Sequence, residues 1–329
     1  MTAPAAIAPW LIEATATLGA ARRADRMHHA LLIHAAPGTG GEWLAGWCTQ
    51  LLLCTAAEGA ACGICTSCRR AAAEQHPDLT IVRPIENSQQ IRIEQIRELI
   101  AELALTAHQG GYKVARIEPG DALNRFAANA LLKTLEEPPA RTVLIVVAAM
   151  PSRLPATLVS RCQRIRIRAP SREESLAWLA ASRGPGAWEN VLDLIGEAPF
   201  AAQELDPAAI GELSAETRKV LADSAAGRAD PVAVAERWSR SELPLRLACV
   251  ENWLTECIRR TVAGYDKREE VHAASRPGAP AGGATSRTLY ELLDRVRDLK
   301  ASLSTPINRS LALESLLRSL GALSTTSSR

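Results

Sequence analysis

Four clustered cysteines are the strongest chemical signal in this chain. Cys54, Cys62, Cys65 and Cys68 follow the spacing Cys-x7-Cys-x2-Cys-x2-Cys. Two overlapping Cys-x2-Cys pairs with a fourth cysteine in one loop suit tetrahedral thiolate ligation of Zn²⁺. Four protein ligands leave no position for water, so we predict a structural Zn²⁺ site. A redox pair is the alternative, although a Cys-x-x-Cys redox motif does not need the other two cysteines.

A glycine-rich turn indicates a second kind of chemistry. Gly38, Gly40 and Gly41 follow an apolar run at residues 30–34 and precede a helical pattern. This is the context of a phosphate-binding P-loop, which also needs a lysine for the phosphates and a Ser/Thr hydroxyl for Mg²⁺. Gly41 and Glu42 stand at those two positions, and a carboxylate repels a triphosphate. The turn predicts a degenerate P-loop that binds no ATP productively; an ordinary glycine-rich turn is the alternative.

Two further positions lack the groups that ATP hydrolysis requires. In P-loop ATPases a strand such as residues 112–117 ends in Asp-Glu, where one acid binds Mg²⁺ and the next activates water. Here the strand ends in Glu118-Pro119. Glu118 can still face a metal ion, but Pro119 cannot abstract a proton. Ala149 ends the strand at 143–149, where an active enzyme carries a polar residue that senses the γ-phosphate. We therefore expect no ATPase activity from this chain alone.

Arg161 is the remaining candidate for a catalytic role. It lies between a short helical pattern at 155–159 and a strand pattern at 163–168. An arginine is always charged and offers a planar fork of donors that suits phosphate oxygens. A surface salt bridge is the alternative for this residue. The arginines of the following strand alternate with isoleucines, and we interpret them as a solvated face: Arg164, Arg166 and Arg168.

Alternating strand and helix patterns position these groups. Apolar runs of strand length are separated by amphipathic helical stretches through the first half of the chain. This order predicts an α/β domain built on a parallel sheet. The helical stretch at 124–137 stops at Pro138-Pro139, because a double proline cannot continue a helix. The predicted strands are 30–34, 79–82, 112–117, 143–149 and 163–168.

The second half of the chain reads as helical. A linker at 169–171 leads into Ser171, which forms a capping-box pattern with Glu174. Helical segments then run to about Phe200. From Asp206 the pattern is helical to the end, without a catalytic signature, except at residues 275–287, where a stretch rich in Gly, Pro, Ala and Ser predicts a flexible loop.

Composition narrows the classes of function. The 329 residues carry a net charge of +2, which gives no overall signal for nucleic-acid binding. No 18-residue apolar run predicts a membrane span. The first ten residues have no cationic segment before an apolar core, so no secretory signal peptide is expected. We therefore expect a cytoplasmic protein, where clustered thiols bind metal more often than they form disulfides.

These motifs together resemble the clamp-loader branch of the AAA+ proteins. The resemblance spans nearly the whole chain, and the first cysteine gap is one residue shorter than is typical of the family. The motifs that carry it are the four-cysteine insertion, Asn-Ala-Leu-Leu-Lys-Thr-Leu-Glu-Glu-Pro-Pro at 129–139, Leu-Pro at 154–155 with Ser-Arg-Cys at 160–162, and Asn-Arg-Ser-Leu-Ala-Leu-Glu at 308–314.

Departures from the family's motor subunit point to a different subunit. The motor carries an intact P-loop, an Asp-Glu strand end and an arginine in its lid that senses nucleotide. This chain has lost all of these, and in the lid Pro199 follows Gly196 at the arginine's place. These losses favour a non-hydrolysing subunit over the motor. They fall at Gly41, Glu42, Pro119, Ala149 and Pro199.

The resemblance implies a fold, a role and partners. Residues 1–168 resemble an AAA+ P-loop-like α/β domain with a zinc module at about 54–68, residues 169–205 a small helical lid domain, and residues 206–329 an all-α collar domain that mediates oligomerisation. The implied role is a stator subunit of the bacterial DNA polymerase III clamp loader, which loads the sliding clamp onto primed DNA at the expense of ATP. The implied partners are gamma/tau motor subunits and delta in a pentameric ring, with the clamp and primer-template DNA met through the complex.

Within that ring, the resemblance implies that Arg161 reaches into the ATP site of the adjacent motor subunit as an arginine finger. An arginine supplied in trans stabilises charge on a transferring phosphoryl group and can be worth about 10³–10⁵ in rate. The chain would then serve the DNA-directed DNA polymerase holoenzyme, a nucleotidyltransferase, without hydrolysing ATP. One alternative is an active ATPase motor of the same family. Another is a zinc-dependent DNA-binding module, against which the near-neutral charge argues.

Overall fold

The chain folds into two compact units. A computed structural model describes residues 7–56, 60–85, 88–108, 111–262, 286–304 and 308–322. Unit 1 comprises Met1–Pro185 and Glu197–Gln203, and unit 2 comprises Gly186–Gly196 and Glu204–Arg329. The chain therefore passes from unit 1 to unit 2, returns for one short segment, and leaves again. The division into three domains at 168 and 205 stays a prediction.

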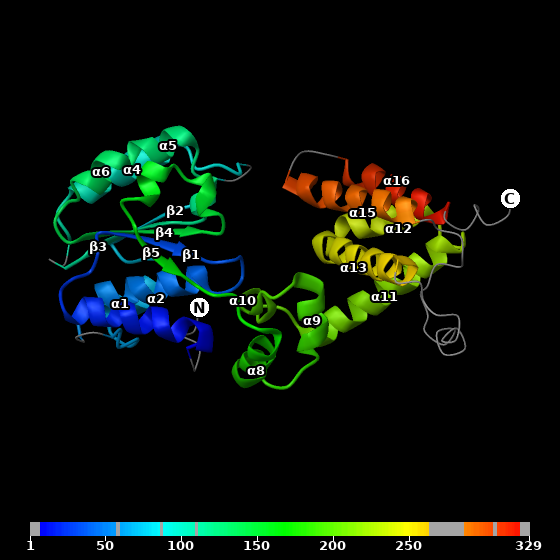
Figure 1. The fold of residues 1–329 in the computed structure, drawn as a ribbon, viewed down its shortest axis with the longest axis horizontal. Coiled ribbons are helices and arrows are strands. Elements are labelled where there is room, and N and C mark those ends of the chain that lie inside the picture. The colour runs from blue at the N-terminus through cyan, green and yellow to red at the C-terminus, as the bar shows by residue number, and fades with distance from the viewer. Residues whose placement is uncertain are drawn as a thin grey trace. The chain divides into compact units, whose positions relative to one another are not determined.

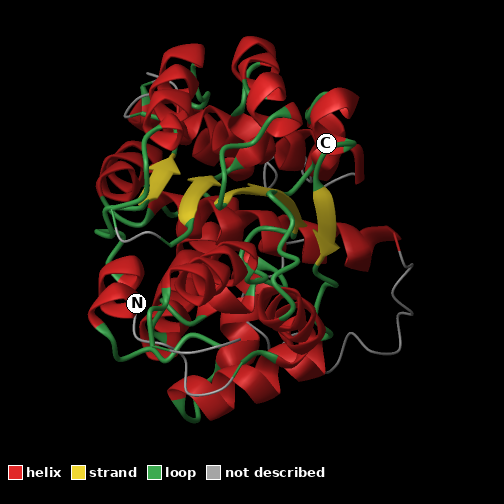
Figure 2. Ribbon diagram, turned by 90° about the vertical axis from the view of Figure 1, so that its left-hand side faces the viewer, coloured by secondary structure: helices red, strands yellow, loops and turns green. Residues whose placement is uncertain are grey.

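Unit 1 is built on the predicted parallel sheet. All four neighbouring strand pairs are parallel, and every strand of the described residues lies in this one sheet (Figure 2). The strands at 142–148 and 163–166 end slightly earlier than the sequence pattern predicts. In spatial order they are β2 (Leu79–Val82), β3 (Lys113–Ile117), β4 (Thr142–Ala148), β1 (Ala30–His34) and β5 (Gln163–Arg166).

Helices cover both faces of this sheet, which explains why its central strands are buried along their whole length, although β3 carries the charged residues Lys113 and Arg116. Every residue of β3 and β4 is buried, as expected for strands with no solvent-facing side. Helices α4 (Ile93–Ala104), α5 (Arg125–Ala130) and α6 (Leu132–Glu136) lie on one face (Figure 1). Helices α1 (Ile12–Arg23) and α2 (Gly41–Leu53) lie on the other.

The remaining helices of unit 1 are short, apart from one. The predicted capping box opens the longest of them, the helix at 172–183: Ser171 Oγ accepts from the N–H of Glu174 at 3.1 Å, and the Glu174 carboxylate accepts from the N–H of Ser171 at 2.9 Å. The predicted helix at 124–137 is divided into α5 and α6, because the N–H of Leu131 turns back to the carbonyl of Asn129. The others are η1 (Pro9–Leu11), α3 (Thr66–Ala72), η2 (Gly120–Ala122), η3 (Pro151–Arg153), α7 (Ala156–Val159), α8 (Arg172–Arg183) and α10 (Pro199–Ala202).

Unit 2 is all-helical in its described residues. Its core gathers leucines from the helices at 207–225, 243–262, 286–301 and 309–321 around Trp238, which is fully buried. Of the predicted loop at 275–287, residues 275–285 lie outside the described residues, and the last two begin the helix at 286–301. None of the helices described in either unit is long and apolar enough to cross a membrane. The helices are α9 (Trp188–Ile195), α11 (Pro207–Ala225), α12 (Pro231–Arg240), α13 (Leu243–Val262), α15 (Ser286–Ala301), η4 (Ser302–Ser304) and α16 (Arg309–Gly321).

Candidate functional site

The glycine-rich turn connects β1 to α2, in the strand–turn–helix setting of a P-loop. Gly38 and Gly40 have φ values of 70° and 104°, which L side chains rarely adopt. Gly40 is the N-cap of α2, so the first N–H groups of a 13-residue helix point at the turn. The backbone therefore has the outline of a phosphate cradle.

Atoms of Ala198 and Phe200 lie close against the glycines of this turn. A Cβ placed on Gly38 would lie 2.7 Å from the Cβ of Ala198, and one on Gly40 would lie 2.6 Å from Cε2 of Phe200. The N–H of Phe200 donates to the carbonyl of Gly38 at 2.9 Å. The start of α10 thus packs directly on the two glycines, and their missing side chains make room for protein.

Aromatic side chains close over the same turn. The ring of Phe200 lies 4.7 Å from Trp178, 6.0 Å from Trp43 and 6.2 Å from Trp10, measured between ring centroids. Trp10 Nε1 donates to the carbonyl of Thr39, within the turn, at 2.8 Å. We call these four rings the aromatic plug. Trp10 and Trp178 are buried, so the plug forms an apolar cluster against the backbone of the glycine-rich turn.

The position of the missing P-loop lysine is closed as well. Gly41 is buried, and a Cβ added there would lie 2.8 Å from the Cβ of Ala35 and 3.0 Å from Cγ1 of Val147. Neither atom is the end of a long flexible side chain, so the backbone would have to shift to admit any larger residue. Glu42, at the Mg²⁺-binding position, is exposed. The structure thus leaves no room for the lysine that the sequence lacks.

Glu118 is held by arginines of its own chain. It is 5% exposed and receives bonds from Arg116 Nη2 at 2.7 and 2.8 Å and from Arg83 Nη2 at 2.5 Å. Arg83 also forms a two-bond pair with Glu74, and these bonds hold the pKa of Glu74 below its usual value. The Glu118 charge is therefore neutralised internally, which works against a role as a Mg²⁺ ligand. In the sequence, the feature that could have predicted this pairing is Arg116, a charged residue next to apolar residues of the same strand.

The end of β4 is fixed by a carboxylate that the sequence patterns did not single out. Asp121 accepts from the N–H of Ala149 at 2.6 Å and from the N–H of Met150 at 2.8 Å. Ala149 itself offers no group to a phosphate. Both oxygens of the Asp121 carboxylate thus already accept hydrogen bonds from backbone N–H groups.

Arg161 lies on the surface, just after α7. Its guanidinium donates from Nη2 to Glu136 Oε1 at 2.5 Å and from Nη1 to the carbonyl of Thr157 at 3.0 Å. The side chain of Arg161 is 36% exposed and that of Glu136 is 52% exposed. In the isolated chain Arg161 therefore forms a surface salt bridge and remains accessible to a neighbouring molecule. Arg164 and Arg166 are exposed on β5, and Arg168 pairs with Glu174.

The cysteine cluster has the geometry of a thiolate metal site. The sulfur atoms of Cys54, Cys62, Cys65 and Cys68 all lie within 4.8 Å of one another. The Cys62 and Cys68 sulfurs are 3.9 Å apart, and tetrahedral Zn²⁺ with bonds of about 2.3 Å requires sulfurs about 3.8 Å apart. The N–H of Cys68 donates to Cys65 Sγ and lowers the pKa of that thiol to about 6. The residues present therefore fit Zn²⁺.

His76 forms hydrogen bonds that hold the loop of the cysteine cluster in place. Its Nδ1 accepts from the N–H of Asp78 at 3.1 Å, so the neutral ring carries its proton on Nε2. Nε2 lies 2.6 Å from Ser67 Oγ, and Ser67 donates to the carbonyl of Leu53 at 2.6 Å. Burial lowers the pKa of His76 and favours this neutral form. The chain of bonds fixes the loop between the first and the last cysteine and leaves His76 without a ligand role.

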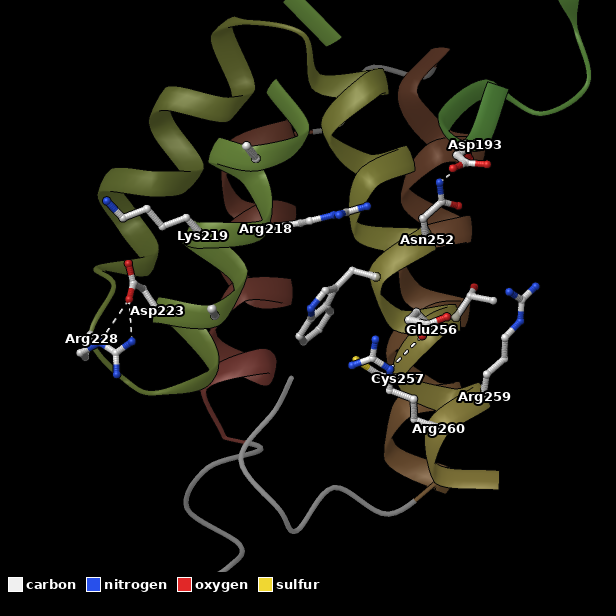
Figure 3. Close-up of a pocket in the computed structure, with 14 residues that line it drawn as sticks. Asp193, Arg218, Lys219, Asp223, Arg228, Asn252, Glu256, Cys257, Arg259 and Arg260 are labelled. Carbon is white, nitrogen blue, oxygen red and sulfur yellow. Dashed lines mark hydrogen bonds and ion pairs between the residues drawn. The ribbon is translucent and has the colours of Figure 1, made fainter. Parts of the chain in front are cut away.

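Unit 2 contains a large cavity whose described lining residues do not form a recognisable catalytic site. It measures about 1100 Å³ and lies between α11 and α13 (Figure 3). Of its three acids, Asp193, Asp223 and Glu256, the last two are paired with Arg228 and Arg260 at 2.7 and 2.8 Å. Burial raises the pKa of the thiol of Cys257 to about 11, which keeps it protonated and unreactive at neutral pH.

Comparison with known proteins gives a consistent result. A family model described as DNA polymerase III, delta subunit, matches residues 12–171. The DNA polymerase III subunit delta' of Pseudomonas aeruginosa is 35% identical over 323 residues, which cover 94% of this chain and 96% of that protein. The delta' subunit of Escherichia coli is 39% identical over 173 residues, or 52% of each chain. The tau subunit of Salmonella typhimurium is 33% identical over 145 residues, or 44% of this chain and 22% of tau.

A solved structure supports the fold. The DNA polymerase III gamma subunit-related protein of Thermotoga maritima superposes with a TM-score of 0.52 at 17% identity, over 94% of this chain and 99% of that one. At this identity the likeness concerns the fold alone. The similarity to the delta' subunit of Pseudomonas aeruginosa runs along nearly the full length of both chains. On that evidence the chain belongs to the family of DNA polymerase III delta' subunits.

Proposed function

We propose that this chain is a non-hydrolysing stator subunit of the bacterial DNA polymerase III clamp loader. Its delta' and tau relatives support a place in that complex. In this role it joins gamma/tau motor subunits and delta in a pentameric ring that loads the sliding clamp onto primed DNA. It contacts the clamp and the primer-template through the assembled ring, and it binds no ATP productively.

The observation that carries the proposal is the filling of the glycine-rich turn. Ala198 and Phe200 come within 2.7 and 2.6 Å of Cβ positions built on Gly38 and Gly40. A nucleotide would have to displace this packing, and it would then meet no lysine in the turn. The internal pairing of Glu118 adds a second, separate obstacle to Mg²⁺-dependent hydrolysis.

Arg161 gives such a subunit a catalytic part to play. We assign it as an arginine finger that enters the ATP site of the adjacent motor subunit and stabilises charge on the γ-phosphoryl group. Its place at the surface after α7 supports the assignment, because a residue that acts in trans must be reachable from outside. Its planar fork can bind two phosphate oxygens at once, which a lysine cannot do.

In such a subunit, the remaining parts of the chain serve stability and assembly. Cys54, Cys62, Cys65 and Cys68 hold a structural Zn²⁺ that stabilises the loop between α2 and α3. Residues 169–205 serve as the lid and residues 206–329 as the collar that joins the ring. The described residues of unit 2 form helices and no strand, which supports a collar role.

Nucleotide binding by the isolated chain tests the proposal against its rival, an active motor. Isothermal titration with Mg²⁺-ATP should give no binding heat at millimolar ATP, with an isolated gamma subunit as the positive control. Adding the chain to gamma and delta should restore clamp loading onto primed DNA. ATP hydrolysis by the isolated chain, lost in a Glu118→Ala variant, would support the motor instead.

A further inference from the structure

We propose that Glu136 is a positioning residue for Arg161, an inference that rests on the proposed finger role of Arg161. The carboxylate of Glu136 accepts from Nη2 of Arg161 at 2.5 Å, and the carbonyl of Thr157 accepts from Nη1 at 3.0 Å. Two acceptors from different elements therefore hold the guanidinium plane. A lone surface arginine would sample many rotamers instead.

Buried neighbours hold both partners of this pair in place. Glu136 is the last residue of α6, and Leu135 beside it is 3% exposed. Arg161 follows α7, in which Leu158 is fully buried. Both leucines belong to the same core cluster between the helices and the sheet. The two charged side chains thus extend from backbone positions that the core fixes, so their separation is set by the fold.

This pair joins two motifs that are far apart in the sequence. Glu136 lies in the stretch 129–139, and Arg161 lies in the stretch 160–162. The double proline after Glu137 ends α6 there, and this places the Glu136 carboxylate at the tip of the helix. The ion pair therefore gives a physical reason for a glutamate at this point of the first stretch.

The contacts leave part of the guanidinium free for a phosphate. Arginine carries five N–H donors, and the two contacts with Glu136 and Thr157 use one donor on each terminal nitrogen. The remaining donors can face an incoming γ-phosphate. Ordering Arg161 before the phosphate arrives reduces the conformational entropy lost when the phosphate binds. The expected effect of Glu136 is on the chemical step, because it acts on the group that stabilises the transition state.

The test uses the reconstituted clamp loader with primed DNA and clamp, and it measures kcat and KM for ATP. Glu136→Gln keeps the shape and removes the charge, and it should lower kcat about two- to fivefold, the range of an exposed ion pair. KM for ATP should stay unchanged, and Glu136→Asp should recover part of the rate. Glu137→Gln is the matched control, since Glu137 is an exposed carboxylate on the next residue.

The double variant Glu136→Gln/Arg161→Ala separates this inference from the proposed function. If Glu136 acts through Arg161, the double variant should be no slower than Arg161→Ala alone. A normal or faster rate for Glu136→Gln, beside a slow Arg161→Ala, would overturn the positioning role and leave the finger role standing. A normal rate for Arg161→Ala would overturn both. Additive losses in the double variant would place Glu136 in another role.

Discussion

The phenyl ring of Phe200 lies against Gly40, so closely that a Cβ on Gly40 would be 2.6 Å from Cε2 of the ring. These residues come from opposite ends of unit 1, one from a turn after β1 and one from α10. Their contact places an apolar side chain on the backbone that would hold phosphate in a P-loop ATPase. The absence of a lysine and the presence of the aromatic plug are therefore two aspects of one site.

Removing the Phe200 ring should weaken unit 1 without creating an ATPase. Phe200→Ala should lower the free energy of unfolding by about 2–3 kcal/mol, less than a fully buried phenylalanine because the ring is half-buried. Urea unfolding followed by tryptophan fluorescence measures this. Phe126→Ala is the control, since that ring is 70% exposed and should change stability little. Strong ATP binding by the Phe200 variant would show that the plug alone blocks the site.

Glu118 should matter for stability and not for hydrolysis. Glu118→Gln leaves the buried Arg116 with only its longer ion pair to Glu74 at 3.5 Å, and we expect a loss of about 3 kcal/mol in the free energy of unfolding. The ATPase rate of the reconstituted ring, measured at a temperature where the variant is folded, should stay unchanged. A variant that is fully stable yet abolishes hydrolysis would identify Glu118 as a metal ligand.

The cysteine cluster should bind one Zn²⁺ per chain. Cys65→Ser removes a thiolate ligand, so it should reduce the zinc content measured by elemental analysis and lower the melting temperature. Cys257→Ala, in the core of unit 2, should keep its zinc. Native protein that is folded and free of metal after purification without chelators would contradict this prediction.

Local patterns predicted the parallel sheet because each strand and helix is specified by residues close together in the sequence. The apolar run at 143–149, found as a strand at 142–148, and the capping box of Ser171 with Glu174 needed no distant information. The aromatic plug was not predictable, because Trp10 and Phe200 meet only after the chain returns from unit 2.

The ion-pair partners of the charged side chains were also not predictable from local sequence patterns. The exposed Arg161 was singled out from its motif, but its partner Glu136 lies 25 positions away and could not be assigned from spacing. The bond of Arg83 to Glu118 also depends on the sheet, since β2 and β3 bring their chain segments side by side. Arg116, by contrast, is only two residues from Glu118, on the same side of one extended segment.

The central claim is that Arg161 acts on a neighbour's ATP, and the ATPase rate of the reconstituted clamp loader tests it most directly. Arg161→Ala and Arg161→Lys are compared with wild type and with Arg164→Ala, an exposed arginine on β5. Both Arg161 variants should assemble normally and should silence the adjacent motor site, because a trans arginine is worth about 10³–10⁵ in rate and lysine lacks the planar fork. Arg164→Ala should behave as wild type. An unchanged rate in Arg161→Ala would contradict the account.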